Sequence, residues 1–276
     1  KGVLTSVDAV DDPLLRFTSG SFTVEAWIKL TGSIPTSYPL SVYPIVTKRK
    51  CAQTGTGGWQ VHLTGTASGA YIAWNADDNA HVLRSDEHIP DTRLQADEWY
   101  HIAVVYDNAS TTTTLWLNGQ HAGADTTERG GGNCVGPLRI GYDDANPSYP
   151  YYFGGHISDV RLSARAVYES PFQPSRSLNV AADGSTLALW RIQTSGGSSG
   201  TSVPDLSANS FTGTISGAAS WAKGAWKHEY AFDSTSAIDV FQGIANASTR
   251  SYVAYTSACN SLGCSTDSIS EATGAP

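Results

Sequence analysis

Hydrophobic and polar residues alternate along the first two thirds of the chain, in short stretches separated by turn-like segments. The clearest stretch is Phe22–Leu30. Its alternate positions place on one face Phe22, Val24, Ala26, Ile28 and Leu30. A repeat of two residues is the period of a β-strand that buries one side and exposes the other.

The same pattern predicts more strands at short intervals. They cover residues 44–48, 59–64, 71–75, 81–84, 100–106, 112–117, 138–141 and 155–162. The dipeptide Asn118-Gly119 is a type I′ turn signal and predicts a hairpin. Helical character is confined to residues 164–169. Many short strands with so little helix indicate an all-β sandwich or barrel.

Between residues 2 and 168 the chain reads FTVEAWIKL, IVTK, GWQVHL, DEWYHIAVVYD, TTLWLNG, LRIGYDD and FGGHISDVRLSARAVY, in that order. This series closely resembles the laminin-G-like members of the concanavalin A-like jelly rolls. The resemblance implies two antiparallel sheets of about six or seven strands each, one convex and one concave, packed face to face. We therefore expect an all-β, two-sheet antiparallel jelly-roll sandwich with extra C-terminal strands.

Three parts are expected along the chain. Residues 1–180 correspond to the jelly roll. Residues 181–240 contain LALWRI and VPDLSANSFTGTISGAASW, which resemble the opening of such a module. They either complete the first jelly roll or open a second copy, because about 50 residues do not bury an apolar face alone. Residues 241–276 resemble the last hairpin of a fibronectin type III domain, since SYVAYTSACNSLGCS combines a Tyr-rich strand with an Asn- and Gly-containing turn.

Composition removes several classes of partner. The formal net charge is −8, from 17 basic and 25 acidic residues, so the chain has no basic footprint for a phosphate backbone. No nucleic acid partner is therefore expected. No apolar run approaches the roughly 20 residues that span a bilayer, so no membrane insertion is expected either.

The four cysteines are even in number and permit three pairings. We favour Cys51 with Cys134, both at loop edges, and Cys259 with Cys264, which flank a turn-like tetrapeptide. Zinc binding is the alternative, but no Cys or His pair stands at zinc-ligand spacing.

Asn108 and Asn246 begin N-x-S sequons and are candidate glycosylation sites. Together with paired cysteines they predict an extracellular protein, secreted or at the cell surface.

The sequence offers little for catalysis. Glycosidases with this fold carry paired carboxylates on one strand, as in Glu-x-Asp-x-Glu, and no such set is present. The neighbouring carboxylates Asp86 and Glu87 point to opposite faces or lie in a turn. Glu25 alternates onto the side of Trp27, where a groove is conceivable, but it lacks an acid–base partner. We expect no enzyme activity.

Calcium is the cofactor that we consider. Members of the resembled family often hold a structural Ca²⁺, and carboxylates at a sandwich rim supply the oxygen ligands it prefers. The candidates are Asp143 and Asp144, at the rim, and Asp159 in GHISDV. The alternative role of Asp159 is to cap backbone amides.

Sugar recognition in this fold uses aromatic rings that stack on pyranose faces. Tyr149, Tyr151 and Tyr152 cluster in a loop next to the rim carboxylates. Tyr38 and Tyr43, in the Pro-rich segment 34–44, extend the same rim. We expect these tyrosines to contact the ligand, although a loop that folds them back over the sheet edge is the alternative.

The sequence thus favours a secreted, non-catalytic carbohydrate-binding or adhesion module whose partner is an extracellular glycan or glycoprotein. The alternative is a structural subunit of an extracellular fibre, a filament in which copies of the chain pair their strands. A glycosidase or lyase comes third.

Overall fold

The computed structural model describes residues 6–32, 34, 36, 41–49, 51, 57–77, 82–88, 92–126, 133–143, 151–192 and 202–216, together with four short strands between 251 and 273. The chain divides into two compact units, residues 1–222 and residues 223–276. Each unit is described by itself.

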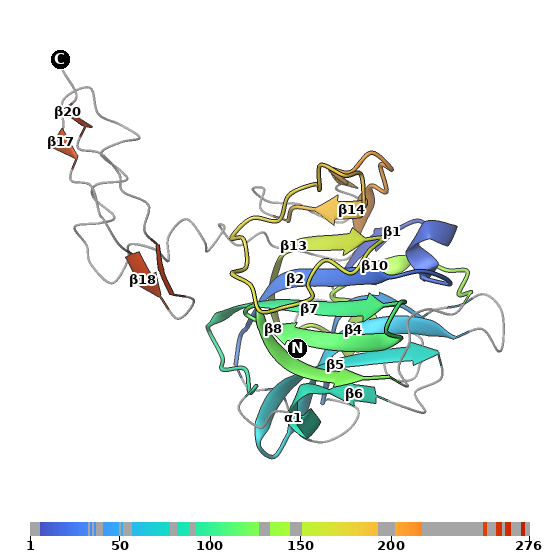
Figure 1. Ribbon diagram of the computed structural model, residues 1–276, viewed down its shortest axis with the longest axis horizontal. Coiled ribbons are helices and arrows are strands. Elements are labelled where there is room, and N and C mark those ends of the chain that lie inside the picture. Colours follow the sequence, from blue (N-terminus) through green and yellow to red (C-terminus); the bar gives the residue numbers. More distant parts are fainter. Residues whose placement is uncertain are drawn as a thin grey trace. The chain divides into compact units, whose positions relative to one another are not determined.

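The first unit contains an eight-stranded antiparallel sheet with the order β15-β16-β1-β10-β3-β4-β5-β6 (Figure 1). Its strands are β1 (Ser6–Ala9), β3 (Val42–Lys48), β4 (Gly58–Thr66), β5 (Gly69–Asp77), β6 (Val82–Arg84), β10 (Leu138–Ile140), β15 (Ser202–Val203) and β16 (Gly213–Ser216). A small ladder formed by β11 (Tyr142–Asp143) and β12 (Tyr151–Tyr152) follows β10.

The second sheet of this unit has six strands in the order β14-β13-β2-β7-β8-β9. They are β2 (Phe22–Leu30), β7 (Trp99–Asp107), β8 (Thr112–Leu117), β9 (Gln120–Asp125), β13 (Gly155–Ser163) and β14 (Thr186–Trp190). The antiparallel pairing of neighbouring strands confirms the all-β, two-sheet sandwich expected from the sequence.

Strands from beyond residue 181 take part in both sheets. β14 pairs with β13, and β16 pairs with β1 near the β15 edge of the larger sheet. Trp190 and Ile215, from these strands, belong to the same hydrophobic core as Val7. The strands β14, β15 and β16 therefore form part of the first sandwich.

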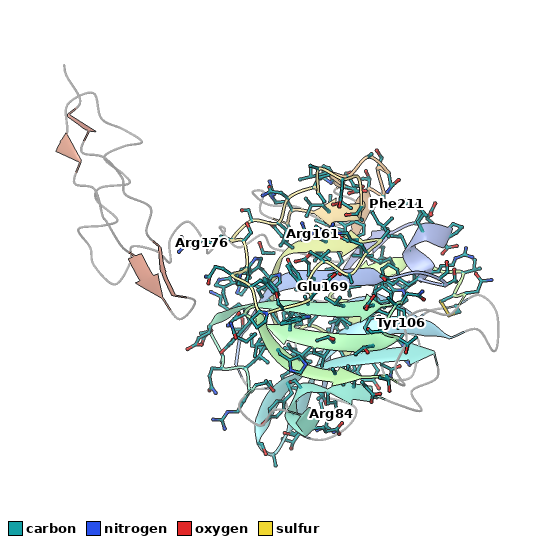
Figure 2. The ribbon with its side chains drawn as sticks, viewed as in Figure 1. Arg84, Tyr106, Arg161, Glu169, Arg176 and Phe211 are labelled. Atoms are coloured by element: carbon teal, nitrogen blue, oxygen red, sulfur yellow. A yellow bond between two sulfur atoms is a disulfide. The ribbon has the colours of Figure 1, made fainter. Side chains whose placement is uncertain are left out.

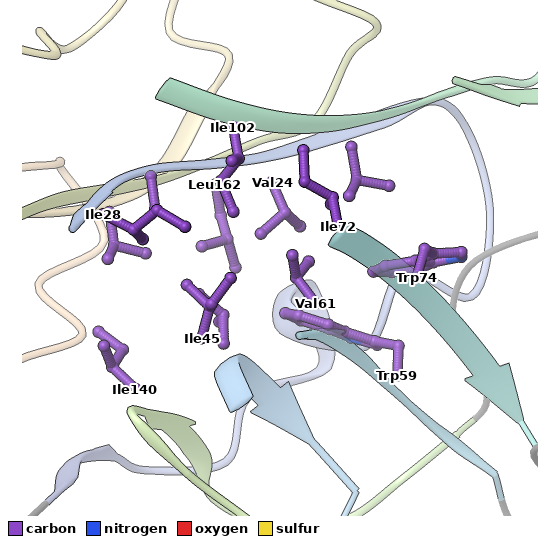
Figure 3. Packing of buried hydrophobic residues seen from close by; sticks show 14 of the residues in the cluster. Val24, Ile28, Ile45, Trp59, Val61, Ile72, Trp74, Ile102, Ile140 and Leu162 are labelled. Carbon is purple, nitrogen blue, oxygen red and sulfur yellow. The ribbon is translucent and has the colours of Figure 1, made fainter. Parts of the chain in front are cut away.

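The core lies between the two sheets (Figure 3). Alternate residues of β2, including Val24 and Ile28, point toward Val61 of β4 and Ile72 of β5. At one end the rings of Trp59 and Trp74 stack at a centroid distance of 5.7 Å. Both indoles are fully buried. Inward-facing residues from both sheets thus supply the hydrophobic stabilisation of the sandwich.

Two short helical turns were not expected from the sequence. η1 (Pro13–Arg16) begins at Asp12, whose carboxylate accepts a hydrogen bond from the Leu14 amide at 2.8 Å. Proline at the first helical position suits this start because its missing N–H costs nothing there. α1 (Ser85–His88) follows β6 directly. The Asn118-Gly119 turn has positive φ at both residues, as a type I′ hairpin requires.

The expected helix at residues 164–169 is absent, which corrects the sequence prediction. Residues 164–185 instead form an irregular connection between β13 and β14, which we call the strap. Part of its backbone bonds to the sheet: the Val167 amide donates to Thr23 Oγ1 at 3.0 Å, and Phe172 N donates to Gly119 O at 3.0 Å. A Cβ on Gly119 would lie 1.8 Å from Phe172 O, so this close approach needs glycine.

In the second unit the structure describes two strand pairs. β17 (Ser251–Tyr252) pairs with β20 (Ala272–Thr273), and β18 (Ala258–Asn260) pairs with β19 (Gly263–Ser265). The β18–β19 ladder places Cys259 directly opposite Cys264 in register. The likeness of residues 241–276 to a fibronectin type III hairpin stays a prediction.

Candidate functional site

The outer face of the eight-stranded sheet carries polar residues that the core does not account for. In β4, Trp59, Val61 and Leu63 point into the core, so strand alternation turns Gln60 and His62 to the outside. The register then places Asn75 of β5 opposite Gln60.

We call this set the polar face. It consists of Arg49, Gln60, His62, Asn75, Arg84 and Asp143. Gln60, His62 and Asn75 are 3%, 4% and 2% exposed, which is low for polar side chains on the outside of a sheet. The Arg49 and Arg84 side chains retain 17% and 30% of their accessible area. A ligand would therefore meet the two guanidinium groups first.

Arg49, Asp143 and Gln60 form a three-membered polar contact. Arg49 Nη1 lies 3.2 Å from Asp143 Oδ2. In the amide orientation that satisfies both neighbours, Gln60 donates to Asp143 Oδ2 and accepts from Arg49 Nη1, each at 3.1 Å. The arrangement offers fixed donors and acceptors side by side, which is the pattern that recognises neighbouring hydroxyl groups.

His62 occupies the middle of the polar face. Arg49 follows β3 on one side of β4, while Arg84 lies in β6 on the other side, across the small Ala73 of β5. Burial lowers the pKa of His62 to about 3, and the charges of Arg49 and Arg84 act in the same direction. The ring is therefore neutral at physiological pH and has one donor and one acceptor nitrogen. Within the described part of the chain no hydrogen bond reaches it.

Arg84 marks the β6 end of the polar face, beside α1 (Figure 2). It contacts both oxygens of Asp86, with Nη2 to Oδ2 at 2.5 Å and Nε to Oδ1 at 3.0 Å. Glu87 adds a second carboxylate at 3.3 Å. Burial opposes the charge of Arg84, but the hydrogen bond and charge of Asp86 raise its pKa. The guanidinium group is thereby held in one orientation.

Three of the five candidate tyrosines lie in the described residues: Tyr43, Tyr151 and Tyr152. Tyr151 and Tyr152 form β12, and both are half-buried. Tyr43 in β3 packs against Gly154, where a Cβ would lie 2.6 Å from the Tyr43 ring. The candidates Tyr38 and Tyr149 lie outside the described residues.

A stack of three side chains includes one of these tyrosines. The rings of Tyr152 and Tyr142 lie 4.8 Å apart and are nearly parallel, and the guanidinium of Arg139 lies 5.3 Å from the Tyr142 centroid. Asp143 follows Tyr142 in β11, so the stack adjoins the polar face.

The calcium candidates do not converge in the described residues. Asp143 pairs with Arg49. Asp159 is fully buried, accepts the Leu178 amide at 2.8 Å and lies 3.6 Å from Arg191 Nε, so it anchors the strap. No group of three metal-ligating side chains occurs in the part of the chain that is described, and Asp144 lies outside it. A bound Ca²⁺ stays a prediction.

A disulfide joins Cys51 to Cys134 with a Cα–Cα distance of 4.8 Å, in agreement with the favoured pairing. It links the segment after Arg49 to the segment before β10. The side chains of Cys259 and Cys264 fall outside the described parts. Asn108 is exposed in the β7–β8 turn, and Asn246 lies outside the described residues.

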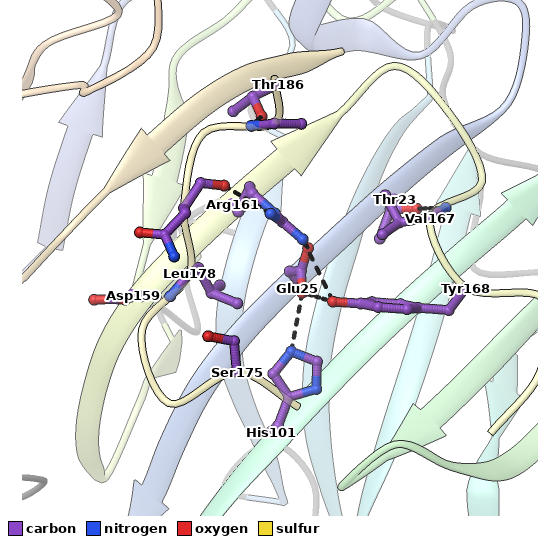
Figure 4. Close-up of polar contacts among 12 residues, drawn as sticks. Thr23, Glu25, His101, Asp159, Arg161, Val167, Tyr168, Ser175, Leu178 and Thr186 are labelled. Atoms are coloured by element: carbon purple, nitrogen blue, oxygen red, sulfur yellow. Dashed lines mark hydrogen bonds and ion pairs between the residues drawn. The ribbon is translucent and has the colours of Figure 1, made fainter. Parts of the chain in front are cut away.

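The outer face of the six-stranded sheet is closed by the strap (Figure 4). Glu25 is fully buried and contacts His101 Nε2 at 3.0 Å, Arg161 at 2.6 Å and the Tyr168 hydroxyl at 2.7 Å. Burial opposes its ionisation, but the hydrogen bond from His101 and the nearby charges keep its pKa below the usual value. Glu25 therefore faces no open groove, which corrects that part of the sequence interpretation.

Sequence reasoning missed most of the polar face. The signal was present in GWQVHL, whose alternation puts Gln60 and His62 opposite the apolar residues of the same strand. Attention to the outward positions of the predicted strands would have found these two residues. The approach of Arg49 and Asp143, which are 94 positions apart in the sequence, depends on the fold.

The chain folds as a two-sheet antiparallel β-sandwich whose larger sheet has a polar outer face. A family model described as the concanavalin A-like lectin/glucanases superfamily matches residues 4–170, more than half of the chain. The chain therefore belongs to this superfamily. No curated protein matches the chain at a significant level.

Among solved structures, the chain is similar to a proposed carbohydrate binding protein from Bacteroides ovatus ATCC 8483, with 18% identity and a TM-score of 0.57. The match covers 80% of this chain and 58% of the other, so this chain spans less than two thirds of that protein. A Ruminococcus gnavus IT-sialidase CBM40 bound to α2,3 sialyllactose matches with 12% identity and a TM-score of 0.44, over 61% of this chain and 92% of that one. A heptameric SAP-like pentraxin from Limulus polyphemus matches with 14% identity and a TM-score of 0.40, over 59% and 77%. The first of these similarities supports the fold.

No helix in the described residues is both long and apolar enough to cross a membrane.

Proposed function

We propose that this chain is a non-catalytic carbohydrate-binding module that acts outside the cell, and that its ligand contacts the polar face. The observation that carries the proposal is His62: a neutral ring, 4% exposed, placed between two guanidinium groups on the outer side of a sheet. Buried polar side chains are normally hydrogen-bonded. Because the His62 ring has no such bond in the described residues, its nitrogens can hydrogen-bond to a ligand instead.

The chemistry of the face suits saccharide hydroxyls. Each hydroxyl group both donates and accepts hydrogen bonds. Arg49 donates and Asp143 accepts at adjacent positions, so two neighbouring hydroxyls can bind to them together. The Tyr142–Tyr152 stack beside this pair offers an aromatic surface for the apolar face of a sugar ring.

The fold similarity to the proposed carbohydrate binding protein from Bacteroides ovatus supports the same function, and so does membership of a superfamily that includes lectins. The disulfide supports an oxidising, extracellular setting. Adhesion to a glycoprotein is the same recognition chemistry applied to a cell-surface partner.

The arrangement does not favour a glycosidase. Glu25 is enclosed by His101, Arg161 and Tyr168 beneath the strap, so substrate has no access to its carboxylate. On the polar face, the Asp143 carboxylate is already engaged by Arg49 and Gln60.

The described residues remove one of the observations behind the fibre alternative. That hypothesis started from strands that lack partners. The outer edge of β14 is instead occupied, because Asp205 Oδ1 accepts from the Leu189 amide at 2.8 Å and Ser207 Oγ donates to Leu187 O at 2.9 Å.

The test is a glycan array probed with the whole chain, followed by calorimetric titration of each ligand found. Arg49→Met removes a donor from the polar face and should weaken binding by about tenfold or more. Arg165→Met is the matched control, because Arg165 pairs with Asp183 at an exposed site away from the polar face. An array without hits, or equal affinity for both variants, would overturn the proposal.

A titration in the presence of a chelator addresses calcium separately. Since the described carboxylates do not form a calcium site, we expect the affinity to survive chelation. Loss of binding on chelation would show that the ligand contacts a metal instead of the polar face alone.

A further inference from the structure

Both guanidinium groups of the polar face are already paired with carboxylates, one inside the set and two beside it. Arg49 pairs with Asp143 at 3.2 Å. Arg84 pairs with Asp86 at 2.5 Å and with Glu87 at 3.3 Å. Two guanidinium groups thus meet three carboxylates, and the balance of these five groups is one negative charge.

His62 adds no positive charge to this balance. Its pKa of about 3 keeps the ring neutral at physiological pH. Gln60 and Asn75, which lie beside it on the same face, are neutral amides. Among the described residues, the groups that face His62 from β3, β4, β5 and β6 therefore offer many hydrogen bonds, and their two guanidinium groups are both paired with carboxylates.

An anionic ligand should bind weakly to such a face. A carboxylate or sulfate that binds Arg49 or Arg84 must compete with the carboxylate already there. Otherwise it lies close to that carboxylate, and like charges at short range oppose binding. A hydroxyl group has no such conflict, because it accepts from the guanidinium and donates to the carboxylate of the same pair.

We infer that the ligand of the polar face is an uncharged saccharide, selected against uronic, sialic and sulfated sugars by the carboxylates that hold Arg49 and Arg84. This inference rests on the proposed function and narrows its substrate class. Arg84 with Asp86 and Glu87 is then the part of the face that determines specificity. These carboxylates repel a negatively charged ligand group at the β6 end of the face, where Glu87 contributes the surplus carboxylate.

The experiment compares a neutral oligosaccharide that binds in the array with its counterpart oxidised at C6, in which a hydroxymethyl group becomes a carboxylate. We expect the oxidised form to bind at least about tenfold more weakly. Affinity for the neutral form should change less than about twofold between about 50 mM and about 500 mM salt, because no net ion pair forms.

A variant makes the comparison specific to the surplus charge. Glu87→Gln should reduce the discrimination between neutral and oxidised ligands by a few-fold, because it removes one repelling carboxylate while Asp86 still orients Arg84. The variant should therefore change the affinity for the oxidised sugar more than the affinity for the neutral one. Asp183→Asn, which removes a carboxylate of an exposed pair elsewhere, should leave both affinities unchanged.

The outcomes separate the two proposals. Equal or tighter binding of the oxidised sugar, with an affinity that falls as salt rises, would overturn the inference while the carbohydrate-binding function stands. Discrimination that Glu87→Gln leaves unchanged would also overturn it. Failure of both the neutral and the oxidised sugars to bind would remove the proposed function itself.

Discussion

Arg49 Nη1 and Asp143 Oδ2 lie 3.2 Å apart, although the two residues are separated by 94 positions in the sequence. The pair connects the end of β3 to β11, and Asp143 is 2% exposed. A charged contact so well shielded should matter for stability as well as for binding. Asp143→Asn should lower the free energy of unfolding by about 1–3 kcal/mol.

Denaturant unfolding of Asp143→Asn, Arg49→Met and the double variant checks this coupling. The double variant should lose less stability than the sum of the two single variants, because each single change already breaks the contact. Strictly additive effects would show that the pair is not coupled.

The buried Glu25 is expected to act on stability and not on ligand binding. Glu25→Gln leaves Arg161 and His101 without the carboxylate that they share, which should cost about 3–5 kcal/mol of unfolding free energy. Urea titration measures the loss, and Asp183→Asn should change it by less than about 1 kcal/mol because its pair is exposed. Glycan affinity of folded Glu25→Gln should equal that of the wild type, and a large drop in affinity would contradict a purely structural role.

Stability should fall as the pH decreases below about 6.5 because of His62. The His62 ring has a pKa of about 3 in the folded chain and an ordinary value of 6.5 in the unfolded chain. Between these two pH values the unfolded state binds a proton that the folded state does not bind. Stability is thus full above pH 6.5 and declines with a slope of up to about 1.4 kcal/mol per pH unit.

Unfolding curves at several pH values between 6.5 and 4.5 test this slope before most carboxylates titrate. His62→Gln should flatten the dependence. Burial and the charge of Lys29 lower the pKa of His156 as well, but this residue is only partly buried, so His156→Gln should flatten the dependence less. An equal slope in wild type and His62→Gln would show that the ring titrates normally.

The Cys51–Cys134 bridge closes a loop of 83 residues and should stabilise the sandwich by restricting the unfolded chain. Replacing both cysteines by alanine should lower the unfolding free energy by about 2–5 kcal/mol. Thermal unfolding with and without a reductant provides the check. If the melting temperature of the wild type is the same with and without the reductant, this contribution is contradicted.

A chain ending at residue 180 should fail to fold cooperatively. It lacks β14 and β16, and with them the fully buried Trp190 and the core residue Ile215. The same chain extended to residue 222 keeps both strands and should show one cooperative thermal transition. Equal stability of the two chains would mean that the strands beyond 181 add nothing to the sandwich.

The fold was largely predictable from the sequence, because a period of two residues depends on local pattern alone. Phe22–Leu30 and Thr112–Leu117 have the predicted bounds, and the Asn118-Gly119 turn has the expected backbone. The strap was mispredicted as helical at residues 164–169, since its conformation is set by contacts with the sheet, such as those of Thr23.

The candidate site was less predictable, since it depends on which strands become neighbours. The sequence singled out Asp143 but not Arg49 or Arg84, because only the order β3-β4-β5-β6 brings the two guanidinium groups to either side of His62. The same holds for Asp159, whose partner Leu178 belongs to the strap.

Nuclear magnetic resonance of the side chains on the polar face, recorded while a bound saccharide is titrated, tests the central claim most directly. We predict that the Nε–H signals of Arg49 and Arg84 and the side-chain amide signal of Gln60 shift together and saturate at the calorimetric affinity. The indole signal of Trp27, beneath the strap, should stay in place. Shifts confined to other surfaces, with these three signals unmoved by a saturating ligand, would contradict the account.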